Sequence, residues 1–68
     1  RDLTARVRAL LPEAEAAHLV SVHAEAGAWV VAMDSPAWAA RVRYRTAELG
    51  DVPVRVTVVP KGKTEVRG

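Results

Sequence analysis

Two regular elements meet in the stretch Met33-Asp34-Ser35-Pro36-Ala37-Trp38-Ala39. The residues before it, 28–33, are few, apolar and rich in β-branched side chains, which predicts a buried or half-buried strand. The residues after it, 37–49, have helical spacing, with Ser35 placed to cap the helix and Pro36 suited to its first position. The stretch therefore predicts a strand followed at once by a capped helix.

A first helix is predicted near the start of the chain, with Asp2 as its cap. Its apolar side consists of four residues at helical spacing: Leu3, Val7, Leu10 and Leu11. Pro12 ends this helix or restarts it, and residues 13–17 are predicted to form one acidic turn.

Residues 18–24 are predicted to form the first strand of a hairpin. Strict alternation places one set of side chains on one face and a second set on the other: Val20, Val22 and Ala24 against Leu19, Ser21 and His23. Residues 25–27 form a short connection in which Gly27 adopts positive φ, as a tight hairpin requires. The second strand presents Trp29, Val31 and Met33 on one face.

A third strand opens at Pro53, after the stop signal Gly50-Asp51. Its apolar residues alternate with polar ones: Val54, Val56 and Val58 with Arg55 and Thr57. The order α-β-β-α-β predicts an α+β fold of two layers, a three-stranded sheet covered on one face by two helices. We expect one domain over residues 1–60 and a flexible basic tail over residues 61–68.

One residue conflicts with the predicted second helix. Its sheet-facing arc contains Trp38, Val42 and Leu49, and Arg45 falls inside the same arc. Either the aliphatic stem of Arg45 lies over the core while its charged end reaches water, or the helix deviates near Thr46.

Charge is uneven along the 68 residues, whose net charge is +2. Residues 1–34 hold three basic and five acidic side chains (−2), and residues 35–68 hold seven and three (+4). A basic half favours an anionic partner or is simply a solvated arginine-rich surface. The chain has no cysteine, which fits a reducing cytoplasm, and no apolar run of the roughly 18–20 residues that a membrane span needs.

The inventory of reactive side chains predicts no enzyme, metal or cofactor. His18 and His23 are five apart on a strand, hence on opposite faces, so they are poor joint metal ligands. Asp34 precedes a helix, where a carboxylate favours the N-terminus or bonds free N–H groups. The sequence has no glycine-rich phosphate loop and no obvious base for its serines.

The sequence does contain candidate binding residues, and several of them have two interpretations. Trp38 is either the largest core side chain or a partner anchor, and Tyr44 is a boundary residue or a partner contact. A diffuse phosphate-binding surface is predicted from five basic residues, with solvated side chains as the alternative: Arg41, Arg45, Arg55, Lys61 and Lys63.

Pieces of the chain between about Leu10 and Pro60 resemble the DciA family, bacterial proteins that load or operate the replicative helicase. The resemblance rests on Leu10-Leu11-Pro12, Ala16-Ala17-His18, Asp34-Ser35-Pro36-Ala37-Trp38-Ala39, Arg43-Tyr44, Glu48-Leu49 and the last valine-rich strand. The chain departs from the family at Arg45, where an apolar residue is expected, and at Ala47, where a proline is expected.

This resemblance implies a KH-like fold and a non-enzymatic adaptor that binds the hexameric helicase DnaB through Trp38, Arg43 and Tyr44. It also implies weak affinity for single-stranded or forked DNA, a monomer when free, and a cytoplasmic, nucleoid-associated protein. The GXXG loop by which KH domains clamp nucleotide backbone is absent from the sequence. A single-stranded nucleic-acid-binding module is the alternative function, and a purely structural domain is the third.

Overall fold

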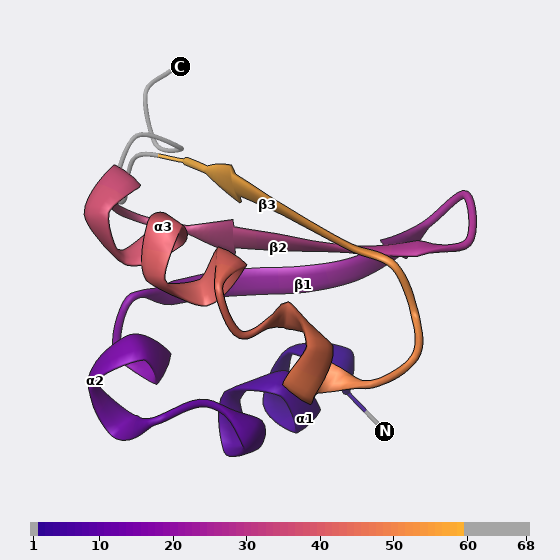
Figure 1. Cartoon of the computed structure of the whole chain (residues 1–68), viewed down its shortest axis with the longest axis horizontal. Helices are drawn as coiled ribbons and strands as arrows, with labels where there is room; N and C mark the ends of the chain where they lie inside the picture. Colours follow the sequence, from indigo (N-terminus) through magenta and orange to yellow (C-terminus); the bar gives the residue numbers. More distant parts are fainter. Residues whose placement is uncertain (1, 60–68) are drawn as a thin grey trace.

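Residues 2–59 are described by the computed structural model, shown in Figure 1. The elements in chain order are α1 (Leu3–Leu10), α2 (Glu13–Ala16), β1 (Leu19–Glu25), β2 (Ala28–Met33), α3 (Pro36–Arg43), the 3₁₀ helix η1 (Thr46–Leu49) and β3 (Val54–Val58). The predicted tail, residues 61–68, lies outside the described residues, as does the domain's expected last residue, Pro60. The order α-β-β-α-β is confirmed, with α2 and η1 as single extra turns.

The sheet has the order β1-β2-β3. β1 and β2 are antiparallel and joined by a tight turn in which Ala26 (φ 52°) and Gly27 (φ 82°) both adopt positive φ. Two consecutive left-handed residues match the right-handed twist of a hairpin. β3 is parallel to β2 and is reached through α3, as a parallel connection requires.

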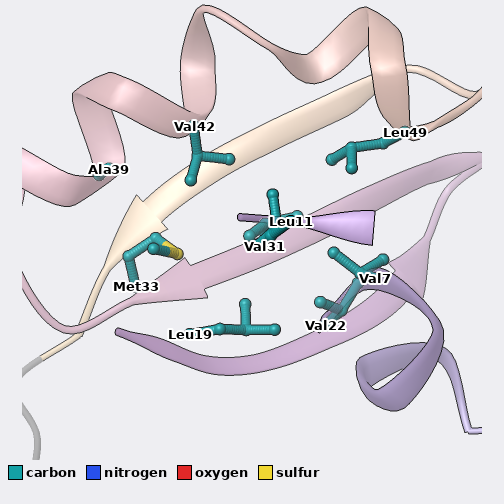
Figure 2. Close-up of a cluster of buried hydrophobic side chains, with 9 residues drawn as sticks. All are labelled: Val7, Leu11, Leu19, Val22, Val31, Met33, Ala39, Val42 and Leu49. Carbon is teal, nitrogen blue, oxygen red and sulfur yellow. The ribbon is translucent and has the colours of Figure 1, made fainter. Parts of the chain in front are cut away.

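Both helices cover the same face of the sheet, which makes this a two-layer α+β domain of KH-like architecture. α1 packs on β1, whereas α3 packs on β3 and β2. Figure 2 shows their inward side chains meeting those of the central strand. The core consists of nine residues: Val7, Leu11, Leu19, Val22, Val31, Met33, Ala39, Val42 and Leu49.

Strict alternation proved wrong at the start of β1. Leu19 pairs with Met33 and Ser21 with Ala32, so a β-bulge leaves Val20 without a cross-strand position of its own. The extra residue shifts the facing pattern. Leu19 and Val22 are therefore both buried, while Val20, predicted to share a face with Val22, is exposed.

The apolar side predicted for the first helix is correct for three of its four residues. Leu10 is 52% exposed. Leu11 is buried because α1 has already ended and the chain is extended there, at φ −94° and ψ 150°. Asp2 caps α1 as predicted, with its Oδ1 accepting a hydrogen bond from the Thr4 N–H at 3.2 Å.

The predicted helix over residues 37–49 is shorter in the structure. α3 ends at Arg43, with Tyr44 as its C-cap, and the chain then forms the separate turn η1. Of the two alternatives left open for Arg45, deviation of the helix is the one observed. The break changes the direction of the Arg45 side chain and still returns Leu49 to the core.

Candidate partner-binding site

The strand–helix junction is held by a contact between Asp34 and His18. His18 Nδ1–H donates to Asp34 Oδ1 at 2.9 Å, and the Asp34 N–H donates to the His18 carbonyl at 3.0 Å. A carboxylate only accepts, so Nδ1 carries the proton of this bond. Ser35 occupies the N-cap position with Pro36 after it, but its side chain makes none of the predicted capping bonds.

Trp38, in the first turn of α3, contacts the same junction through His18. Its ring stacks on the His18 ring with centroids 4.6 Å apart and planes 11° from parallel. The Arg41 guanidinium carbon lies 5.0 Å from the centroid of the Trp38 ring, a cation–π distance. Trp38 is half-buried and packs against the core cluster, so it is a boundary residue with features of both interpretations.

The His18→Ala variant is expected to lower the free energy of unfolding by about 1–3 kcal/mol, because it removes both the Trp38 stack and the Asp34 hydrogen bond. His23→Ala is the matched control. The exposed His23 side chain pairs with the exposed Glu25 carboxylate at 3.2 Å, so its loss should cost less than about 0.5 kcal/mol. Urea unfolding followed by circular dichroism measures both, and equal values would contradict a structural role for the stack.

Arg45 is part of an ion-pair cluster. Its Nε lies 2.8 Å from Glu15 Oε1, an ion pair whose alignment falls short of a hydrogen bond, and its Nη1 donates to Glu48 Oε1 at 3.2 Å. Glu15 is 4% exposed. The Glu15 carboxylate holds the pKa of Arg45 above its ordinary value, with Glu48 adding to the effect and partial desolvation opposing it. Arg45 therefore remains charged at every working pH and neutralises a buried acid.

An asymmetry follows for variants of this pair. Arg45→Ala is expected to lower the melting temperature strongly, because the buried Glu15 carboxylate then has no counter-charge. Glu15→Gln should lower it less, since Arg45 is partly exposed and keeps Glu48. Thermal unfolding at pH 7 of the two variants and of Arg45→Ala/Glu15→Gln tests this. The double variant should melt above Arg45→Ala, and a double variant that melts below it would contradict the counter-charge role.

Tyr44 is the most exposed large side chain of the site. It follows α3 directly and is 92% exposed, beyond the boundary position expected for it. The neighbouring Arg43 turns toward the sheet, where its Nη2 donates to the Val56 carbonyl at 3.2 Å. Arg41, Arg43 and Tyr44 thus come from the last turn of α3, and Trp38 lies one turn earlier.

Of the five basic residues predicted to contact phosphate, the three that the structure describes do not share one surface. Arg55 stands between Val54 and Val56, which pack on the core, so its side chain lies on the face of the sheet away from the helices. Arg41 lies beside Trp38 on α3, and Arg45 faces Glu15. Lys61 and Lys63 lie outside the described residues.

Sequence reasoning did not find Glu15, Asp34's contact with His18, or Arg43's contact with β3. Arg45 gave the one available signal, because a charge on an apolar arc implies either a snorkelling side chain or a buried counter-charge. Among residues 2–59, no group of three or more histidine or acidic side chains is placed to hold a metal ion. No helix in the same part of the chain has the length and apolarity to cross a membrane.

Comparisons with family models, curated proteins and solved structures found no match to this chain. The resemblance to the DciA family therefore has no support beyond the quoted motifs.

Proposed function

We propose that this domain is a non-enzymatic adaptor of DNA replication that binds the hexameric helicase DnaB and assists its loading onto DNA. The observation that carries the proposal is the 92% exposure of Tyr44 at the end of α3. A tyrosine held in that position contributes little to its own fold, and tyrosine and arginine are favoured as interface anchors. Arg43-Tyr44 is also one of the motifs on which the family resemblance rests.

Supporting residues lie next to Tyr44. Trp38 and Arg41 form a cation–π pair one turn away, and the Trp38 ring is itself stacked on His18. These contacts restrict the rotamers of both side chains before a partner arrives, which lowers the entropy cost of binding. The adaptor is proposed to act as a monomer in the cytoplasm, close to the nucleoid, without cofactor or metal.

Single-stranded nucleic acid is the second candidate ligand, favoured by Arg41 beside the half-buried Trp38, since bases stack on aromatic rings. Against it stands the separation of the basic residues. With Arg45 paired to Glu15 and Arg55 on the opposite face, a nucleic-acid strand that follows Arg41 meets few further phosphate contacts from residues 2–59. We therefore propose only weak binding to single-stranded or forked DNA.

Two titrations with the full chain test the proposal. Binding to the cognate helicase is measured by calorimetry at two salt concentrations, and binding to a labelled single-stranded oligonucleotide is measured by fluorescence anisotropy at the same two. We expect a helicase complex together with weak DNA binding whose log–log salt slope is about 0.7 per phosphate contact. Tight, steeply salt-dependent DNA binding without a helicase complex would contradict the adaptor function and favour the second candidate.

A further inference from the structure

The two edges of the sheet differ in how their backbone groups are satisfied. At the β1 edge, the Thr4 hydroxyl accepts from the Val22 N–H at 2.9 Å and donates to the Val22 carbonyl at 3.1 Å. The Arg8 Nη2 donates to the Leu19 carbonyl at 3.3 Å. Side chains of α1 thus occupy the outward backbone groups of Val22 and the Leu19 carbonyl, which blocks another strand from pairing with this part of the β1 edge.

The β3 edge is open. In the parallel pairing with β2, the Trp29 N–H donates to the Pro53 carbonyl and the Val59 N–H donates to the Met33 carbonyl, each at 2.8 Å. In a parallel ladder alternate residues face the same neighbour, so residues 53, 55, 57 and 59 face β2. The N–H and C=O groups of Val54, Val56 and Val58 therefore point outward.

Only one of these outward groups has a partner among residues 2–59, namely the Val56 carbonyl, which accepts from Arg43. That contact is exposed, so an incoming N–H can replace it. β3 and β1 are the two edge strands of the sheet. In Figure 1, β3 runs along the upper margin of the sheet, and α1 lies below β1. β3 offers five consecutive residues at this margin, a usual length for a strand.

The side chains on either face of β3 specify what would pair with it. On the helix-covered face, Val54 and Val56 are half-buried and Val58 is 38% exposed, which leaves apolar surface beside the free edge. On the open face, Arg55 is exposed, whereas Arg43 reaches the Val56 carbonyl at the edge from α3, on the helix-covered side. An added strand with apolar residues on one face and acidic residues on the other is complementary to both.

We propose that the outer edge of β3 binds an extended segment of a protein partner, of alternating β-branched and acidic residues, as a fourth strand of the sheet. Backbone hydrogen bonds to Val54, Val56 and Val58 hold the segment, and its carboxylates face Arg55. Arg43 belongs both to this surface and to the proposed helicase-binding residues, but the test of the edge does not depend on the helicase.

The probe is the synthetic peptide Ac-(Val-Glu)3-Val-amide, added to the ¹⁵N-labelled full chain, with amide exchange followed residue by residue. In the free protein the amides of Val54, Val56 and Val58 should exchange fast, and those of Arg55 and Thr57 slowly, because only the latter bond to β2. A saturating concentration of the peptide should slow amide exchange at Val54, Val56 and Val58 and leave the exchange rates of Arg55 and Thr57 unchanged. The lysine counterpart, Ac-(Val-Lys)3-Val-amide, should bind more weakly.

Val58→Pro with Val58→Thr as its control tests the backbone contact. Proline removes an outward N–H and leaves the hydrogen bonds to β2 intact. It should therefore weaken binding of the peptide by about fivefold, which corresponds to roughly one hydrogen bond. Threonine keeps the N–H and should bind within about twofold of the parent. Melting temperatures verify that both variants fold. If Val58→Pro does not fold, Val56→Pro replaces it in the same test.

Several results would overturn the proposal. One is the absence of any peptide-induced protection, and another is equal binding of the lysine peptide. Slow exchange of Val54, Val56 and Val58 in the free chain would mean that the chain's own residues or a second copy already occupy the edge. Protection of these amides by a single-stranded oligonucleotide in place of the peptide would assign the edge to nucleic acid.

Discussion

Met33→Ala should lower the free energy of unfolding by about 2–5 kcal/mol, the range for removing a long buried aliphatic side chain. Met33 is fully buried at the end of β2, where it is paired with Leu19 on β1 and with Val58 on β3. Figure 2 shows its side chain directed into the core between the strands and α3. A domain of this size has a stability of only a few kcal/mol, so much of the variant should be unfolded.

Val30→Ala is the matched control for Met33→Ala. Val30 belongs to the same strand, but it faces away from the helices and is only half-buried, so its truncation should cost about 1 kcal/mol or less. Urea unfolding monitored by circular dichroism at 25 °C gives both values. A loss for Met33→Ala no larger than that for Val30→Ala would show that the core is not centred on β2.

The elements most securely predicted from the sequence are those whose pattern is uninterrupted. β2 and the start of α3 lie where an apolar run and a Ser-Pro step place them, and Val54 and Val56 alternate with Arg55 as expected. These signals are local, because they depend on backbone preferences and on a single periodicity. The α+β class follows from them, since short links leave few topologies open.

The errors in the predicted elements have tertiary causes. The bulge at Val20 has no signal in a β-branched stretch, because an extra residue costs nothing in local propensity. α3 ends at Arg43 although helical spacing continues to Leu49. The pairing of Arg45 with Glu15, 30 residues away in the sequence, accompanies that break, and no local rule contains such a contact.

The candidate site shows the same division. Trp38, Arg43 and Tyr44 were predicted from the sequence as partner-binding residues, but only the structure shows what surrounds each of them. The Trp38 ring stacks on the His18 ring, the Arg43 side chain contacts the edge of β3, and the Tyr44 side chain is almost wholly exposed to solvent. Helical spacing gives the direction of a side chain relative to the helix axis. It does not give the neighbours of that side chain, because these come from distant segments of the chain.

Tyr44→Ala is expected to weaken the proposed helicase complex by about thirtyfold or more, the loss that defines an interface hot spot. The melting temperature should stay unchanged, because a side chain that is 92% exposed contributes almost nothing to folding. Calorimetric titration of the helicase into the parent and the variant measures the first quantity, and thermal unfolding the second.

Two further variants make this test specific. Leu10→Ala removes another exposed large side chain, on α1 and distant in sequence from the site, and should leave helicase affinity within about twofold. Arg41→Glu reverses a charge beside Trp38, so it should weaken the single-stranded DNA binding more than the helicase complex. Equal losses for Tyr44→Ala and Leu10→Ala would remove Tyr44 from the interface. A helicase complex unaffected by Tyr44→Ala yet abolished by Arg41→Glu would instead identify the Trp38–Arg41 pair as the contact, because charge and not the tyrosine ring would then supply the binding energy.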